Sequence, residues 1–209
     1  MKKRMKFIVL LVFLSFGLTT QAQLRFGIKG GLNLSTLSDY SDVLKVKSLQ
    51  LDDDMDGKAL MRSGLHLGVL AQLDLPLDFF VQPEVLFSLQ GVKEKINGKS
   101  STEALNYLQI PVYVGHKFNA GFGLDVIVGA GPYFAYGVSG TKNIFDVFKQ
   151  YDVGAAAMAG IQISKLQVTL NYDFGLIDIY DNVWETAKEV LKNATISNRN
   201  LKVSIGYFF

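Results

Sequence analysis

The sequence predicts an all-β protein, an eight-stranded antiparallel up-and-down transmembrane β-barrel. Three observations lead to this prediction. Hydrophobic residues make up 49% of the 209 residues, yet beyond the first 22 they lie in alternating segments and form no long apolar run. Long and short connections alternate between these segments, and the last segment is an amphipathic strand that ends in phenylalanine.

The first 22 residues have the pattern of a secretory signal peptide. Basic residues between Lys2 and Lys6 precede an apolar run from Phe7 to Leu18, which is too short to cross a bilayer as a helix. Thr20-Gln-Ala22 is a small-x-small cleavage site. We therefore expect residues 1–22 to be removed on export and residues 23–209 to form the barrel domain.

The first half of the exported chain contains four segments in which apolar and polar residues alternate. This period of two places successive side chains on opposite faces of a sheet. In the third segment, for example, Val81 and Val85 share the apolar face, while Gln82 and Glu84 share the polar face. The four segments are Leu24–Leu34, Leu65–Asp74, Phe79–Gly91 and Tyr107–Phe118.

The second half continues the same alternation and brings the count of strands to eight. Its last segment resembles the C-terminal signal that the outer-membrane barrel assembly machinery recognises, and it carries Tyr207 and Phe209 on one face. We expect these two residues to form a barrel-assembly signal and the machinery to be a partner during biogenesis. The four segments are Phe122–Val138, Asp152–Ile163, Leu166–Leu176 and Leu201–Phe209.

The connections predict which end of the barrel faces the periplasm. Bacterial outer-membrane barrels have tight periplasmic turns and longer extracellular loops, and an even number of strands returns both termini to the periplasmic side. Pro83 and Pro111 fall inside strands and predict bulges or strand ends there. The long connections lie near 35–64, 92–106, 139–151 and 177–200, and the short ones near 75–78, 119–121 and 164–165.

Charged residues on the inward face predict a polar plug that neutralises itself. An eight-stranded barrel has an interior only just wide enough for side chains, and buried charges are costly unless paired. We expect Arg25, Lys29, Glu84 and Lys202 to form a polar network in the lumen, with at least one of the bases reaching Glu84. Asp152 is left out because it starts its strand at the rim. The balanced set consists of the bases Arg25, Lys29, Lys117 and Lys202 and the acids Asp74, Glu84, Asp125 and Asp173.

Four motifs resemble the PorT-like outer-membrane β-barrel domain family, a family of small porin-like barrels. They are Phe26-Gly-Ile-Lys-Gly-Gly-Leu-Asn33, Phe80-Val-Gln-Pro-Glu-Val-Leu-Phe-Ser-Leu-Gln-Gly91, Leu105-Asn-Tyr-Leu-Gln-Ile-Pro-Val112 and Ala130-Gly-Pro-Tyr-Phe134. The resemblance implies an outer-membrane location and, in most members, no assigned activity. One member is linked to a specialised secretion pathway, but the shared motifs are scaffold motifs and do not carry that link. Gln109 stands where the family more often has glutamate.

Asp52, Asp54 and Asp56, followed by Gly57, match the opening of a Ca²⁺-binding loop. The closing carboxylate is missing, because position twelve of such a loop is Ser63. We therefore expect no cofactor. The three aspartates remain an incomplete candidate site for Ca²⁺ in the first extracellular loop.

The sequence shows no set of nucleophile and oriented base around His66 or His116, so no catalytic residue and no enzyme are predicted. Residues 183–192 have helical spacing and predict a short amphipathic helix, which we expect to cap the barrel, with contact to a partner or to lipid headgroups as the alternatives. Four of the 21 basic residues lie in residues 1–22, which leaves 17 basic residues against 19 acidic ones in the exported chain, so no basic patch argues for nucleic acid.

These features predict a scaffold or accessory envelope protein that acts through its extracellular loops. Its expected partners are outer-membrane lipid and an envelope protein. A narrow or gated pore for small solutes is the alternative. An outer-membrane enzyme and a soluble lipocalin-like barrel remain as further hypotheses, although a lipocalin would need an apolar lumen and a polar exterior.

Overall fold

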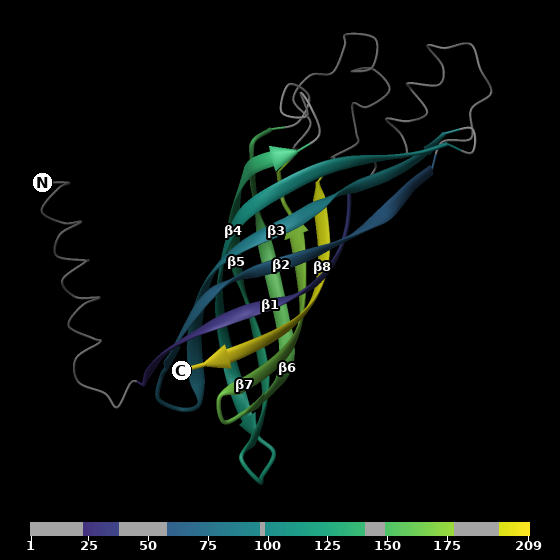
Figure 1. The fold of residues 1–209 in the computed structure, drawn as a ribbon. Coiled ribbons are helices and arrows are strands. Elements are labelled where there is room, and N and C mark those ends of the chain that lie inside the picture. The colour runs from purple at the N-terminus through teal and green to yellow at the C-terminus, as the bar shows by residue number, and fades with distance from the viewer. Residues whose placement is uncertain (1–22, 38–57, 97–98, 141–148, 178–196) are drawn as a thin grey trace, which may run out of the picture.

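The computed structural model describes residues 23–37, 58–96, 99–140, 149–177 and 197–209, and these form a closed antiparallel barrel (Figure 1). Each strand pairs with the next along the chain, and β8 pairs with β1 to close the sheet. The predicted fold class is confirmed. The strands are β1 (Leu24–Leu37), β2 (Lys58–Asp74), β3 (Phe79–Ile96), β4 (Lys99–Asn119), β5 (Leu124–Gly140), β6 (Tyr151–Ile163), β7 (Leu166–Gly175) and β8 (Asn198–Phe208).

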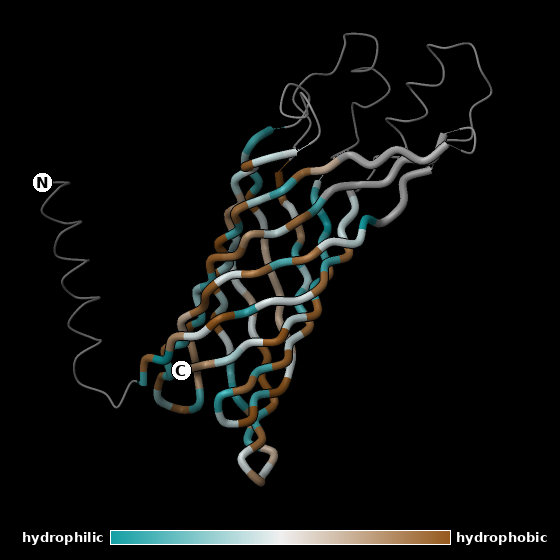
Figure 2. The backbone as a smooth tube through the Cα atoms, in the orientation of Figure 1, coloured by the Kyte–Doolittle hydropathy of each residue, from teal (hydrophilic) through white to brown (hydrophobic). Residues whose placement is uncertain are grey.

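The barrel is apolar outside and polar inside, the reverse of a soluble protein. Leu32, Val69 and Leu170 are typical outward residues, each at least half exposed, whereas Lys29, Glu84 and Lys202 are buried. The alternation of apolar and polar positions can be followed along each strand in Figure 2. An outward apolar band with a polar interior is the pattern of an outer-membrane barrel. No helix among the described residues is long and apolar enough to cross a membrane.

Aromatic side chains form a partial girdle on the outer face near β3, β4 and β8, at the end of the barrel where the sheet begins and ends. The imidazole ring of His116 lies between two of them, with centroid distances of 4.9 Å to Phe79 and 4.6 Å to Phe118. The rings of Tyr207 and Phe209 are 6.2 Å apart on the same face. Aromatic girdles are typical of the interface between lipid and water, so these residues indicate the membrane boundary at this end.

Three compact turns close this periplasmic end. They connect β2 to β3, β4 to β5 and β6 to β7, while β1 begins and β8 ends at the same rim. The second turn covers residues 120–123, slightly later than the predicted 119–121. Positive φ angles concentrate in these turns, at Leu77, Asp78, Phe122 and Ser164 as well as at two glycines.

The prediction of a long connection at 92–106 is wrong, because most of these residues belong to strands. β3 continues to Ile96, and β4 begins at Lys99, with Lys93 paired to Thr102 and Ile96 to Lys99. The polar sequence of this region lacks the apolar alternation that marks a lipid-facing strand. Alternation is needed only where one face meets lipid, whereas backbone pairing can continue into water without it.

The prediction of bulges or strand ends at the two prolines is also wrong. The strand register is continuous through Pro83 and through Pro111, and neither residue ends a strand. The register instead shifts between Met61 and His66 in β2 and between Asn106 and Tyr107 in β4. A proline removes a single N–H donor, and here the ladder on either side of it holds the register.

Candidate functional site

Two buried ion pairs join the strands inside the barrel. Lys29 Nζ on β1 lies 2.7 Å from Glu84 Oε1 on β3, and the two side chains are 1% and 0% exposed. Lys202 Nζ on β8 lies 2.8 Å from Asp173 Oδ2 on β7, with both side chains 1% exposed. The structure thus brings Lys29 to Glu84, while Lys202 has a different acidic partner.

Side-chain amides surround both ion pairs. Gln82 Nε2 donates to Glu84 Oε1 at 2.7 Å, and Gln82 also exchanges hydrogen bonds with Gln167 on β7. Gln109 donates to Asp173 Oδ2 at 2.8 Å and accepts from Lys202 Nζ at 3.2 Å. An amide can make both of these contacts, whereas a carboxylate in the same place would add a second negative charge beside Asp173. Gln109 therefore completes this part of the network.

The remaining predicted charges gather at the periplasmic end. Arg25 and Lys117 share one acid, because Arg25 Nη2 lies 3.0 Å and Lys117 Nζ 2.6 Å from the Asp74 carboxylate. The Arg25 guanidinium also lies 4.8 Å from the ring centroid of Phe208. Asp125 accepts a 3.3 Å hydrogen bond from Asn119 and forms no ion pair with the described residues. The pairing is therefore uneven, although the numbers of predicted bases and acids match.

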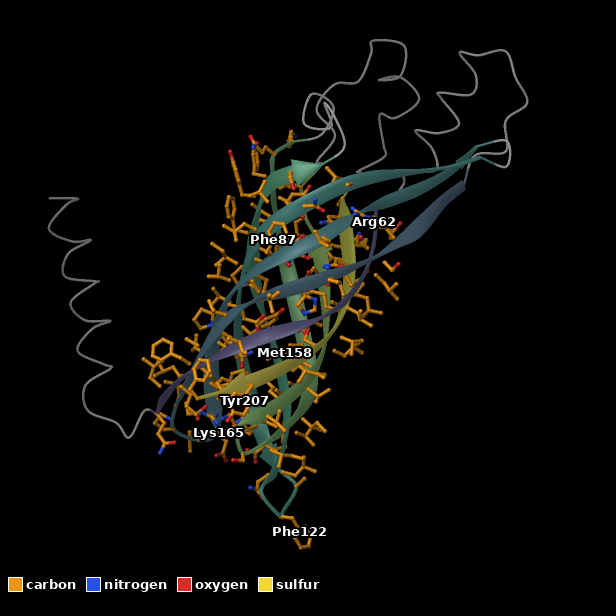
Figure 3. The ribbon with its side chains drawn as sticks, viewed as in Figure 1. Arg62, Phe87, Phe122, Met158, Lys165 and Tyr207 are labelled. Atoms are coloured by element: carbon orange, nitrogen blue, oxygen red, sulfur yellow. The ribbon has the colours of Figure 1, made fainter. Side chains whose placement is uncertain are left out.

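The interior contains two charged residues that the sequence interpretation left out. Asp152 is 0% exposed and accepts a 2.8 Å hydrogen bond from the Tyr133 hydroxyl, so it lies within the lumen and not at an open rim. Arg62 contacts the carbonyl oxygen of Gln90 near the other end of the barrel (Figure 3). The period of two could have found both, because Asp152 is in phase with Met158 and Arg62 with His66.

The structure also brings together a serine, a histidine and an asparagine. His66 Nδ1 lies 2.6 Å from Asn33 Oδ1, and His66 Nε2 lies 2.9 Å from Ser204 Oγ. Sequence inspection did not connect these residues, which come from β2, β1 and β8. All three are 3% exposed or less, and Asn33 additionally donates to Ser88 at 2.9 Å. Since a substrate would have no surface to reach, we interpret this group as a structural link between strands.

Several predicted features lie outside the described residues. These are the signal peptide at 1–22, the metal candidate Asp52, Asp54 and Asp56, and the helix at 183–192. In the part of the chain that the structure describes, no group of three or more His, Cys, Asp or Glu residues could hold a metal ion. Tyr207 and Phe209 lie on the outward face, 42% and 69% exposed, and their role in assembly stays a prediction.

Comparison with known proteins assigns a family to this architecture. Residues 19–181 match the family model described as "Outer membrane protein beta-barrel domain". No curated protein sequence matches the chain.

Solved structures that resemble this chain share little sequence identity with it. OprG from Pseudomonas aeruginosa is 13% identical, with a TM-score of 0.47 over 90% of this chain and 97% of that one. Neisserial surface protein A is 12% identical, with a TM-score of 0.49 over 88% and 97%. Ail of Yersinia pestis, in complex with the heparin analogue sucrose octasulfate, is 14% identical, with a TM-score of 0.40 over 90% and 99%.

Proposed function

Because this chain belongs to the outer-membrane protein β-barrel domain family, we propose that it is a scaffold or accessory protein whose extracellular end contacts an envelope partner. The barrel belongs to the outer membrane, and its export through a cleaved leader at residues 1–22 is part of the proposal. The PorT-like resemblance is compatible with this role but does not name the partner.

The packed interior is the observation that carries the proposal. Lys29, Glu84, Asp173 and Lys202 are almost completely buried in two ion pairs, and the amides bonded to them connect strands across the lumen, with Gln109 on β4 reaching β7 and β8 and Gln82 on β3 reaching β7. Solute passage would require these pairs to separate, leaving charges without partners in a narrow space. This cost argues against the alternative of a pore and moves the functional surface to the ends of the barrel.

The extracellular end has an extension that a plain membrane anchor would not need. A transmembrane β-strand needs about 9–11 residues to cross a bilayer. β7 has 10 residues, but β2, β3 and β4 have 17, 18 and 21, and their ends run beyond those of the other strands (Figure 1). At about 3.3 Å per residue, the surplus of about 10–12 residues in β4 corresponds to about 33–40 Å of strand outside the membrane. We infer that this three-stranded extension carries the partner-binding surface.

Shortening the extension should abolish partner binding and leave the barrel intact. Lys93 pairs with Thr102, so residues 93–102 can be replaced by an Asn-Gly turn that keeps the register of the hairpin. We expect the shortened and full-length proteins to give equal membrane yield and the same mobility shift on unheated gels. Reversible cross-linking in native membranes, followed by purification, should recover a discrete partner only with the full-length chain. An unchanged set of cross-linked proteins would contradict the proposal.

The pore alternative has its own test. We expect the purified barrel to give no stable conductance steps in planar bilayers, because its lumen is filled by paired charges and amides. A large porin reconstituted in the same bilayers provides the positive control. Reproducible steps from folded protein would favour the pore over the scaffold.

A further inference from the structure

We propose that the periplasmic end of the barrel also binds a partner, a periplasmic protein that presents a basic side chain within an apolar surface. Two exposed apolar residues, Leu77 and Phe122, lie in the two turns whose neighbouring residues, among them Asp78 and Asp125, line a polar pocket. This surface is at the opposite end from the extracellular extension and does not depend on the function proposed above.

The folding of the barrel does not by itself explain the exposure and the backbone conformation of Leu77 and Phe122. Phe122 is 109% exposed at the tip of the β4–β5 turn (Figure 3), and its φ of 54° lies in the left-handed region. Leu77 is 81% exposed with a φ of 61° in the β2–β3 turn. Bulky residues rarely adopt this conformation, which glycine and asparagine favour. A glycine at either position would relieve the backbone and remove apolar surface from water, so neither residue is explained by the turn it occupies.

Hydrogen bonds hold the Phe122 turn in one conformation. The backbone N–H of Gly121 donates to Asn119 Oδ1 at 3.0 Å, and the N–H of Leu124 donates to the carbonyl oxygen of Gly121 at 3.0 Å. Ala120 N–H donates to the carbonyl oxygen of Leu124 at 2.9 Å. A side chain presented on a preorganised turn loses little conformational freedom on binding. The tip is therefore suited to insertion into an apolar pocket of another protein.

The polar pocket between the two turns supplies the charge. It has a volume of about 260 Å³, and the backbone N–H of Lys117 joins its two sides by donating to the carbonyl oxygen of Asp78 at 2.9 Å. Asp74 is already paired with Arg25 and Lys117, whereas neither Asp78 nor Asp125 forms an ion pair with the described residues. The pocket lining contains three acids, Asp74, Asp78 and Asp125, against the single base Lys117, which also interacts electrostatically with Asp125. This excess of negative charge favours a lysine or arginine side chain from the partner.

Charge and position favour a protein over the inner leaflet of the membrane as the occupant. Phe122 lies four residues beyond Phe118, which belongs to the aromatic girdle, and the polar Asn119 lies between them. Asp78 and Asp125 would face phosphate groups of the same charge if the turns were embedded among lipid headgroups. An apolar tip beside unpaired acids therefore fits a protein surface better than a lipid surface.

Photo-cross-linking in intact cells tests the proposal with the full-length chain. The photoreactive residue benzoylphenylalanine replaces Phe122, and a matched control carries it at Phe118 in the lipid-facing girdle. We expect a discrete protein adduct at position 122 and only lipid adducts at position 118. In the Asp78→Asn/Asp125→Asn background the adduct at 122 should fall about tenfold, the change expected when one charge-assisted contact is lost.

A second placement of the probe separates docking from folding. With benzoylphenylalanine at Leu77, Phe122→Gly should abolish the protein adduct while the mobility shift on unheated gels and the membrane yield stay unchanged. Lipid adducts alone at position 122, no protein adduct from folded barrel, or a protein adduct indifferent to both sets of substitutions would each overturn the proposal.

Discussion

Replacing Glu84 with alanine is expected to lower the urea midpoint of barrel unfolding, because the substitution leaves Lys29 buried without its carboxylate. The Lys29 and Glu84 side chains are 1% and 0% exposed and 2.7 Å apart. Removing one member of a buried pair typically costs about 3–5 kcal/mol. Gln82 also loses its acceptor at Glu84 Oε1, which adds to the cost. The measurement is a urea titration of refolded protein in lipid vesicles, followed by mobility on unheated gels.

A double variant separates the charge effect from the loss of packing. Lys29→Met/Glu84→Leu removes both charges and keeps similar volume, and replacing a whole buried pair by apolar residues is often close to neutral. We therefore expect the double variant to be more stable than Glu84→Ala, and both to remain in the outer membrane. A Glu84→Ala barrel as stable as the unaltered one would show that the pair contributes nothing to stability.

Gly31→Ala is expected to impair folding severely, because an added methyl group would collide with the neighbouring backbone. A Cβ at Gly31 would lie 1.9 Å from the carbonyl oxygen of Val203 and 2.8 Å from the Cα of Ser204 on β8. Overpacking typically costs about 1–3 kcal/mol, and more when the obstacle is backbone that cannot rotate away. We expect a lower yield of folded barrel and a lower urea midpoint.

Gly206→Ala provides the matched control at an inward glycine two residues beyond Ser204. The closest atom to a Cβ there would be the Cβ of Gln167 at 3.6 Å, an ordinary contact. This substitution should leave both yield and midpoint nearly unchanged. Equal losses from the two substitutions would mean that loss of glycine, and not the collision on β8, determines the effect.

The sequence was sufficient to predict which side chains face the lumen and which face lipid, but not which lumen side chains contact one another. The alternation of apolar and polar residues along β3 assigned Glu84 to the lumen. A basic partner was expected for it, since a lone buried carboxylate is costly. Which base reaches Glu84 depends on strand tilt and stagger, which the alternation does not encode. Lys29 therefore contacts Glu84, while Lys202 contacts Asp173 and Arg25 contacts Asp74.

Two other differences have a common physical origin at the ends of strands. Residues 92–106 were predicted as a loop because their sequence lacks alternation, and Asp152 was assigned to the rim because the apolar pattern begins beside it. The alternation of apolar and polar residues arises because one face of each strand contacts lipid. The alternation therefore ends where the strand leaves the membrane. Backbone pairing and the polar interior both continue further, as the β3–β4 hairpin and the Asp152–Tyr133 hydrogen bond show.

The buried ion pairs also bear on how the barrel avoids errors during assembly. A slip of one residue between strands would turn apolar side chains into the lumen, and the lipid environment rejects it. A slip of two residues keeps every face correct, so the apolar pattern alone cannot distinguish it from the native pairing. Such a slip of β1 would move Lys29 by about 6.6 Å along the strand direction, out of contact with Glu84. Because a buried lysine without a partner is costly, the Lys29–Glu84 pair favours the native register over a slip of two residues.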